Sequence, residues 1–245
     1  GELHVPGVST YIHPLSNGDL LTIGMPGGED GLGLDWSLTQ LSLFNLSDLT
    51  NPTLADTQQL TPAYLDADCT SIRYCGWAWS YSEATYEHKA FTYWGPAGLL
   101  AVPLSTYRYV YDSVEIDGRW YSYSGYEYVS KLMLVDVDLE NRSLSIHGEI
   151  DHSTFYNDGE GASGWWGSDT SVRRSVFMGD YVYAFSGAGV SATSYADMNT
   201  TSTLELPGYE PAETYYYEDV AVSDSSSEDS SDSGESEGSP PKEDP

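Results

Sequence analysis

The chain has 245 residues and carries 38 acidic against 9 basic side chains, a formal net charge of −29 at pH 7. Nucleic acid and anionic membrane surfaces are excluded as expected partners, because both bind through the clustered lysine and arginine that this sequence lacks. With 40% hydrophobic residues the chain can bury a core, yet it has no apolar run long enough to span a membrane. Neither an initiator methionine nor a signal peptide precedes Gly1, so we expect a processed or excised segment.

Short runs in which apolar and polar residues alternate, separated by Gly, Asn, Asp and Pro, predict strands throughout residues 1–217. Three stretches share one order: a strand, a glycine turn, two further strands, an asparagine-containing turn and an outer strand. The glycine turns lie at Gly18, Gly98 and Gly179. The three repeat units are expected at about residues 4–60, 84–151 and 172–207.

Four antiparallel strands repeated in this way are typical of the blades of a β-propeller, so we predict an all-β fold of the β-propeller class. The glycine turns are 80 and 81 residues apart, farther than the roughly 40 to 50 residues of simple blade repeats. The tyrosine-rich stretch from Ser105 to Tyr128 is therefore expected to be a loop insertion or an additional, degenerate blade. A two-sheet sandwich with coincidental hairpin similarity is the alternative.

Three blades do not close a ring, because propellers have about four to eight. Either the chain holds the C-terminal blades of a longer propeller, with the remaining blades of the same parent chain as partners, or its Cys- and Tyr-rich regions supply further strands. In the first case the isolated chain should expose an apolar sheet face and tend to associate.

Residues 218–245 hold ten acidic residues and one lysine, with no large apolar residue after Val222, which predicts a disordered acidic tail. The other 28 acidic and eight basic residues leave a net charge of −20 on residues 1–217. Salt screening or bound cations make such an excess tolerable, which favours a saline, extracellular setting, whereas the alternative is an acidic surface that serves solubility alone.

Cys69 and Cys75 are the only cysteines of the chain. Their spacing does not match the CxxC pattern of redox or zinc sites, so a disulfide is favoured over free thiols. A disulfide implies an oxidising compartment.

Seven stretches carry a resemblance to a known family: ELHVPGVSTYIHPL from Glu2, GDLLTIG from Gly18, LSLFNLSD from Leu41, SEATYEHKAF from Ser82, GLLAVP from Gly98, GEIDHS from Gly148 and VRRSVFMGDYVYAFSGAGV from Val172. With these stretches in this order, the chain resembles secreted bacterial and archaeal proteins with a C-terminal β-propeller domain, which are distantly similar to WD-repeat propellers and have no established activity. The resemblance implies a propeller and export, hence a secreted, cell-surface or periplasmic location. It supplies no catalytic residues.

Two histidines stand beside carboxylates at expected strand ends, His88 after Glu87 and His152 after Asp151. Such pairs can orient an imidazole for metal binding or proton transfer. The alternative is structural, in which each histidine ties one blade to the next through hydrogen bonds to the backbone. In an extended strand Glu87 and His88 would point to opposite faces and could not share a site.

A second candidate site is the glycine-rich segment with Trp165, Trp166, Arg173 and Arg174. Adjacent exposed tryptophans are suited to a sugar face, a peptide or an aromatic group of a partner. The alternative is that the tryptophans pack internally and that the arginines are counterions for the protein's own carboxylates.

Calcium is the candidate cofactor, suggested by oxygen-rich segments at residues 29–35, at Asp136 and Asp138, and at residues 157–160. None of them matches the twelve-residue calcium loop.

No GxSxG, P-loop or HExxH motif is present, so an enzyme is not favoured, although propeller active sites assemble from distant loops. We therefore expect a secreted β-propeller binding or scaffold module that recognises a protein or carbohydrate ligand through its blade loops. The alternative is an exported hydrolase or lyase with its site at the propeller channel, dependent on a metal held by His88 or His152.

Overall fold

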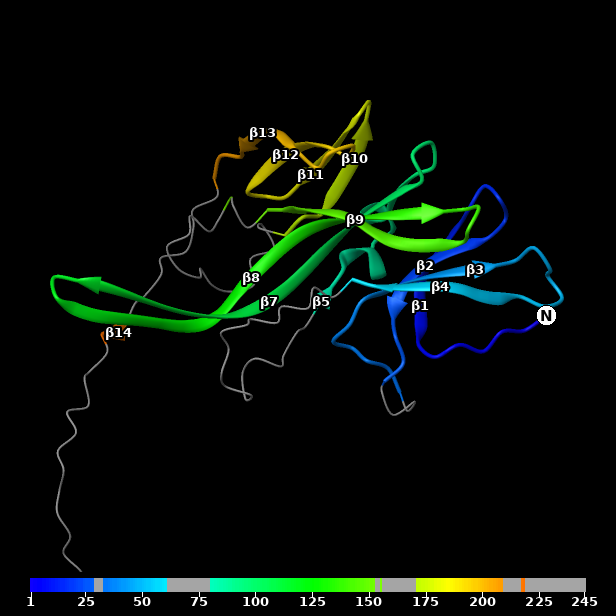
Figure 1. Ribbon diagram of the computed structural model, residues 1–245, viewed down its shortest axis with the longest axis horizontal. Coiled ribbons are helices and arrows are strands. Elements are labelled where there is room, and N and C mark those ends of the chain that lie inside the picture. The colour runs from blue at the N-terminus through cyan, green and yellow to red at the C-terminus, as the bar shows by residue number, and fades with distance from the viewer. Residues whose placement is uncertain (29–32, 61–79, 153–154, 156–170, 209–216, 219–245) are drawn as a thin grey trace, which may run out of the picture.

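The computed structural model describes residues 1–28, 33–60, 80–152, 155, 171–208 and 217–218. This part of the chain forms antiparallel β-sheet, with two short 3-10 helices. Three four-stranded units lie side by side, and we name them blades 1, 2 and 3 in chain order (Figure 1). Three sheets of this kind exclude the two-sheet sandwich and confirm the predicted propeller architecture.

Blade 1 is a meander in which each strand pairs with the next along the chain. Its strands are β1 (Val8–Pro14), β2 (Leu20–Met25), β3 (Gln40–Asn45) and β4 (Thr53–Gln59). Exposed and half-buried residues alternate along β1, as expected for an edge strand with one covered face.

Blade 3 repeats the same meander. Its strands are β10 (Arg174–Met178), β11 (Tyr181–Phe185), β12 (Gly189–Ser194) and β13 (Thr200–Glu205). All six residues of β13 are exposed, so this strand forms the outer edge of the blade.

Blade 2 lies between the other two and consists of β6 (Thr92–Trp94), β7 (Leu99–Ile116), β8 (Arg119–Asp138) and β9 (Ser143–Asp151). Before the glycine turn at Gly98 the alternating sequence predicts a strand over residues 89–94, but β6 covers only the last three of them. The first part of the predicted strand lies in the second of two 3-10 helices, η1 (Glu83–Thr85) and η2 (His88–Ala90).

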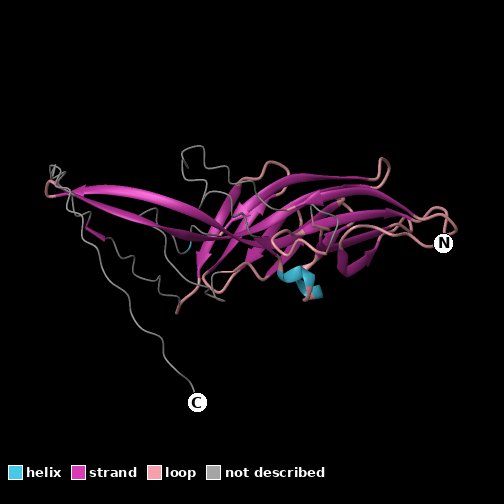
Figure 2. Ribbon diagram, turned by 90° about the horizontal axis from the view of Figure 1, so that it is seen from below, coloured by secondary structure: helices cyan, strands magenta, loops and turns pink. Residues whose placement is uncertain are grey.

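The tyrosine-rich stretch is neither a loop insertion nor a further blade. It extends β7 and β8 into one long hairpin, in which the pairing runs from Leu99 with Asp136 to Ile116 with Arg119. This hairpin runs well beyond the three blades (Figures 1 and 2). Its turn is an Asp-Gly pair, both residues with positive φ, the conformation that two-residue hairpin turns require. Two short strands pair with the extension, β5 (Ser80–Tyr81) with β7 and β14 (Tyr217–Glu218) with β8.

Both faces of blade 2 are covered by a neighbouring blade. On β7, Leu100, Val102 and Leu104 belong to the core shared with blade 1, whereas Leu99 and Ala101 belong to the core shared with blade 3. This alternation follows from the period of two along a strand, which sends successive side chains to opposite faces. Each fully buried leucine contributes about 1.5–3 kcal/mol relative to an exposed one.

A turn with an aspartate recurs between the last two strands of every blade. Asp48 accepts hydrogen bonds from Thr50, Asp138 from the amides of Glu140 and Asn141, and Asp197 from Asn199. Hydrogen bonds lower the pKa of all three carboxyl groups, with the largest contribution from Thr50 for Asp48, from Asn141 for Asp138 and from the side chain of Ser194 for Asp197. The asparagine-containing turns expected from the repeat are thus built on a shared aspartate.

Several expectations fall outside the described residues. Cys69 and Cys75 lie in residues 61–79; of the acidic segment predicted at residues 218–245, Glu218 ends β14 and residues 219–245 lie outside the described residues. In the part of the chain with described structure, no helix is long and apolar enough to cross a membrane.

Candidate functional site

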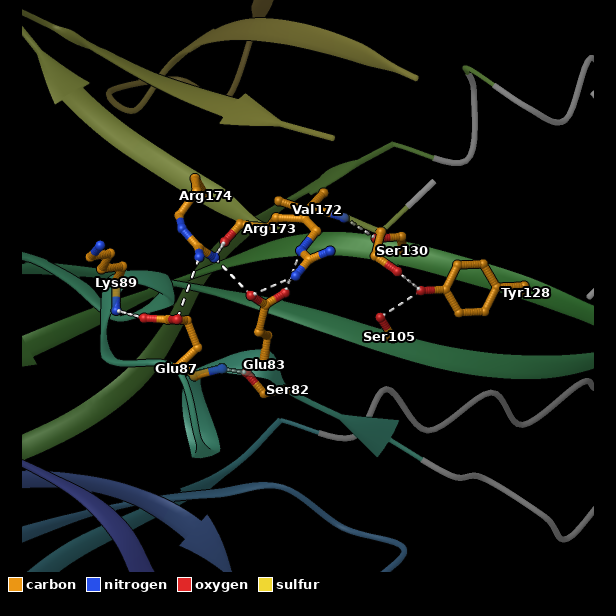
Figure 3. Close-up of polar contacts among 12 residues, drawn as sticks. Ser82, Glu83, Glu87, Lys89, Ser105, Tyr128, Ser130, Val172, Arg173 and Arg174 are labelled. Carbon is orange, nitrogen blue, oxygen red and sulfur yellow. Dashed lines mark hydrogen bonds and ion pairs between the residues drawn. The ribbon is translucent and has the colours of Figure 1, made fainter. Parts of the chain in front are cut away.

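A cluster of ion pairs joins blades 2 and 3 around the carboxylate of Glu83 (Figure 3). Arg173 Nε lies 2.8 Å from Glu83 Oε2, and Arg174 Nη1 lies 2.8 Å from Glu83 Oε1. The side chain of Glu83 is only 8% exposed. Both guanidinium groups therefore compensate one buried negative charge.

Local backbone structure places these groups. Ser82 is the N-cap of η1, where its hydroxyl accepts a hydrogen bond from the amide of Ala84 at 3.3 Å and donates to the carbonyl of Pro103 at 2.5 Å. These two hydrogen bonds of the Ser82 hydroxyl hold Glu83 at the first position of the helix. On blade 3, the amide of Arg173 donates to the carbonyl of Phe185 at 2.8 Å, which holds Arg173 at the start of β10.

The cluster is balanced in charge. Arg174 Nη2 lies 3.8 Å from Glu87 Oε2, so two guanidinium groups face two carboxylates. The hydrogen bond that Arg173 donates to Glu83, together with the negative charge of Glu83, raises the pKa of Arg173. Arg173 and Arg174 thus lie where they act as counterions for carboxylates of the protein itself, the alternative to a ligand-binding role. Their role in ligand binding stays a prediction.

A cavity of about 140 Å³ opens beside this cluster. Its lining residues come from the segment before β6, from β7 and from the start of blade 3; they are Tyr81, Glu83, Tyr86, Pro103, Ser105, Ser171, Val172 and Arg173. The rings of Tyr81 and Tyr86 are stacked with centroids 5.8 Å apart, and Tyr86 is 66% exposed. Burial, followed by the hydrogen bond with Tyr86, raises the pKa of the Tyr81 hydroxyl, so that it stays protonated.

Tyr128 on β8 fastens one wall of the cavity. Its hydroxyl lies 2.7 Å from Ser105 Oγ and 2.5 Å from Ser171 Oγ (Figure 3). The amide of Val172 donates to Ser130 Oγ at 2.7 Å. These bonds attach the chain that enters blade 3 to the long hairpin of blade 2, so the shape of the cavity is fixed by both blades.

His88 lies in a different setting from the one expected. It starts η2 instead of a strand, and Glu87 is the N-cap of that helix. His88 Nδ1 is consequently 3.6 Å from Glu87 Oε1, which corrects the expectation that the two side chains diverge. The imidazole is 69% exposed.

His152 is fully buried between blades 2 and 3. Its Nε2 lies 2.8 Å from Ser191 Oγ and its Nδ1 lies 3.2 Å from Ser186 Oγ, both on blade 3 or its loops. Burial lowers the pKa of His152 to about 4, against a smaller opposing effect of the Asp151 charge. His152 thus connects the blades, through serine hydroxyls and not through the backbone contacts expected.

A second histidine between the same blades, His147, was not anticipated. His147 Nε2 donates to the carbonyl of Tyr195 at 2.6 Å, and its Nδ1 lies 3.0 Å from Asp136 Oδ1. Asp136 was a calcium candidate, but here its partner is an imidazole. The sequence offered one signal, since His147 and Asp136 alternate with apolar residues on paired strands.

The remaining candidate ligands are dispersed. Trp165 and Trp166 lie outside the described residues, as do residues 29–32 and 157–160 of the calcium segments. Among the residues that are described, no group of three or more His, Cys, Asp or Glu side chains is placed to hold a metal ion.

Comparisons with known proteins agree with this architecture. The family model described as "Beta propeller domain" matches residues 1–198. A protein of Methanocaldococcus jannaschii that is described as uncharacterized is 43% identical over 70 residues, an alignment that covers 27% of this chain and 10% of that protein. The chain therefore spans about a tenth of the length of that relative. No solved structure gives a significant match.

Proposed function

Because the chain belongs to the β-propeller domain family, we propose that it is a binding or scaffold module that recognises a protein or carbohydrate ligand at the loops between blades 2 and 3. The contact site is the cavity beside Glu83, with the exposed ring of Tyr86 at its edge. A cavity of about 140 Å³ fits a single group, such as one sugar unit or one amino-acid side chain.

One observation carries this proposal: an exposed aromatic pair and a half-exposed guanidinium share a cavity that two blades hold in place. The side chain of Arg173 is 48% exposed although it is paired with Glu83. Its remaining N–H groups can donate to a hydroxyl or carbonyl of a ligand. The flat ring of Tyr86 supplies apolar contact area with little loss of side-chain entropy.

Export of the protein is part of the same proposal. The support is the net charge of −29, which is tolerated most readily in saline surroundings where Coulomb repulsion is screened.

The proposal is tested on arrays of soluble oligosaccharides and of short peptides, with affinities then measured by calorimetry. Tyr86→Ala should weaken binding of the ligand class about 5- to 150-fold, because truncation of an aromatic contact removes about 1–3 kcal/mol. Trp120→Ala is the control, since Trp120 is 55% exposed and lies near the turn of the long hairpin, where it pairs with Glu115, ten strand positions beyond the cavity residue Ser105.

Binding confined to sugars or to peptides identifies the ligand class. The proposal fails if neither array binds the protein, or if Tyr86→Ala binds as tightly as the unaltered chain.

A further inference from the structure

The side of blade 3 that faces away from blade 2 is apolar and uncovered. We call it the blade 3 outer face, and its residues are Val176, Met178, Tyr181, Tyr183, Phe185, Val190, Ala192 and Leu204. Strand register makes them contiguous: Val176 pairs with Tyr183 and Phe185 with Val190. Val176 is 49% exposed and Leu204 61%. Their strand neighbours Phe177 and Val182 point the other way, into the core with blade 2.

Among the described residues, the side of blade 1 that faces away from blade 2 also contacts no other blade, but it is recessed at its centre, where Thr22 is 2% and Ser42 8% exposed. We call it the blade 1 outer face. Its residues form three rows across the strands β1 to β4. The first row is Ser9, Gly24, Gln40 and Gln59, the second is Ile12, Thr22, Ser42 and Thr57, and the third is Pro14, Leu20, Phe44 and Leu54. A groove of about 340 Å³ lies on this face.

Small residues hollow this groove. A Cβ at Gly24 would overlap the carbonyl of Val8, so only glycine fits there. The hydroxyls on its floor are satisfied within the blade, because Ser9 Oγ donates to Thr22 Oγ1 at 2.8 Å and Gln40 Nε2 donates to Ser42 Oγ at 3.2 Å. The floor can therefore be covered without leaving those hydroxyl groups unpaired.

Neither outer face carries a carboxylate, in a protein with 38 acidic residues; the blade 1 outer face has no charged side chain, and the blade 3 outer face has one, Arg174 beside Phe185, which is paired with Glu83. The residues that line the groove are uncharged throughout. Loss of charged residues and gain of aromatic ones mark the buried centre of an interface. The two faces also complement each other, since one presents a ridge of tyrosine, phenylalanine and methionine and the other a groove floored by small residues.

We propose that two copies of this chain associate head to tail, with the blade 3 outer face of each copy seated on the blade 1 outer face of the other. Blade 2 shows how such contacts work within the chain, because it accepts a neighbouring blade on each of its faces. Two copies, each with the three blades that the described residues form, supply six blades, within the range of about four to eight that closes a propeller. A contact between unlike faces that closes after two copies leaves no blade face uncovered.

The test is sedimentation velocity of the 245-residue chain in saline buffer, which should show a dimer. Val176→Asp places a carboxylate on the blade 3 outer face, and Thr57→Glu places one on the exposed outer strand of blade 1. Each should weaken the dimer about a hundredfold or more, because a buried, unpaired charge is introduced twice per dimer. Leu49→Asp, on the 72% exposed turn residue between β3 and β4, should leave the dimer unchanged.

An equimolar mixture of Val176→Asp and Thr57→Glu distinguishes unlike from like faces. Each mixed pair retains one unaltered contact, so the mixture should form a heterodimer that neither variant forms alone. Met178→Asp and Ile12→Asp, at residues 60% and 53% exposed, replace the first pair of variants if either fails to fold by circular dichroism.

A monomeric unaltered chain overturns the proposal. So does a dimer that both variants leave intact, or one that Val176→Asp abolishes without rescue in the mixture.

Discussion

His152 and Glu83 are ionisable side chains that the junction of blades 2 and 3 buries in two different ways. His152 is held neutral among serine hydroxyls, whereas Glu83 is held beside two guanidinium groups. Burial of His152 opposes its protonation, whereas the two guanidinium groups compensate the negative charge of the buried Glu83 carboxylate. Each has a measurable consequence for stability.

The stability of the protein should fall as the pH is lowered from about 6.5 to about 4 through His152. Its folded pKa is about 4 against an ordinary value of 6.5, so in this window the unfolded chain binds the proton and the folded chain does not. The full effect is about 3 kcal/mol. Urea unfolding at several pH values measures it. His152→Gln should flatten this part of the profile, and equal slopes for both proteins would exclude His152 as the cause.

Glu83→Gln should lower the free energy of unfolding by about 1–3 kcal/mol, because two arginines lose the carboxylate that compensates them. The estimate is below that for a fully buried pair because the arginine side chains are 48% and 36% exposed. Denaturant unfolding measures the change. Glu140→Gln, on an exposed turn of blade 2, is the matched control and should be neutral. A neutral Glu83→Gln would contradict the account of the cluster.

The sequence identified His152 because a carboxylate precedes it, but the serines that surround it lie 34 and 39 positions away and carry no local signal. Glu83 was missed for the same reason, since its partner Arg173 is 90 positions distant. Only the Ser-Glu-Ala-Thr sequence hinted at its place, because serine is a favoured N-cap. The order of the blades is what brings these residues together.

Strand β7 is the element on which the interior depends, since its alternate residues enter two different cores. The repeat of glycine turns predicted this strand correctly at its start. Its length was not predicted, because the tyrosine-rich sequence was treated as an interruption of the repeat. The Asp117-Gly118 pair was the overlooked signal, because Asp-Gly between alternating residues is a strong indicator of a hairpin turn.

Leu100→Ala should destabilise the protein by about 2–5 kcal/mol, because Leu100 is completely buried between blades 1 and 2. Leu49→Ala is the control in the turn between β3 and β4, where the side chain is 72% exposed, and should cost less than about 1 kcal/mol. Thermal and chemical unfolding both measure the difference. Similar losses for the two variants would show that blade 1 does not cover β7.

The molecule as a whole combines an apolar stack of blades with a strongly acidic surface. Composition predicted the apolar interior and the acidic charge, and the alternation of apolar and polar residues predicted the β-sheet. Composition and alternation can be read from the sequence because they are local properties of the chain. The contact of blade on blade required the structure, since each core draws residues from two blades that are distant in sequence.

Added salt should raise the thermal midpoint of unfolding. The net charge of −29 places mostly like charges near one another in the compact state, and salt screens their repulsion. Calorimetry between 0.05 and about 2 M NaCl follows the effect, with an uncharged osmolyte as the control for solvent exclusion. A midpoint independent of salt would show that repulsion within the chain does not limit its stability.

Native-state amide hydrogen exchange tests the stacking of the blades most directly. In the Val176→Asp variant, which we expect to be monomeric, residues 99–106 of β7 and residues 129–138 of β8 should exchange more slowly than any strand of blades 1 and 3, because blade 2 is then the one blade of the three with a neighbour on both faces. Exchange of these amides as fast as that of β1 or β13 would contradict the account, because it would mean that blade 2 is not enclosed.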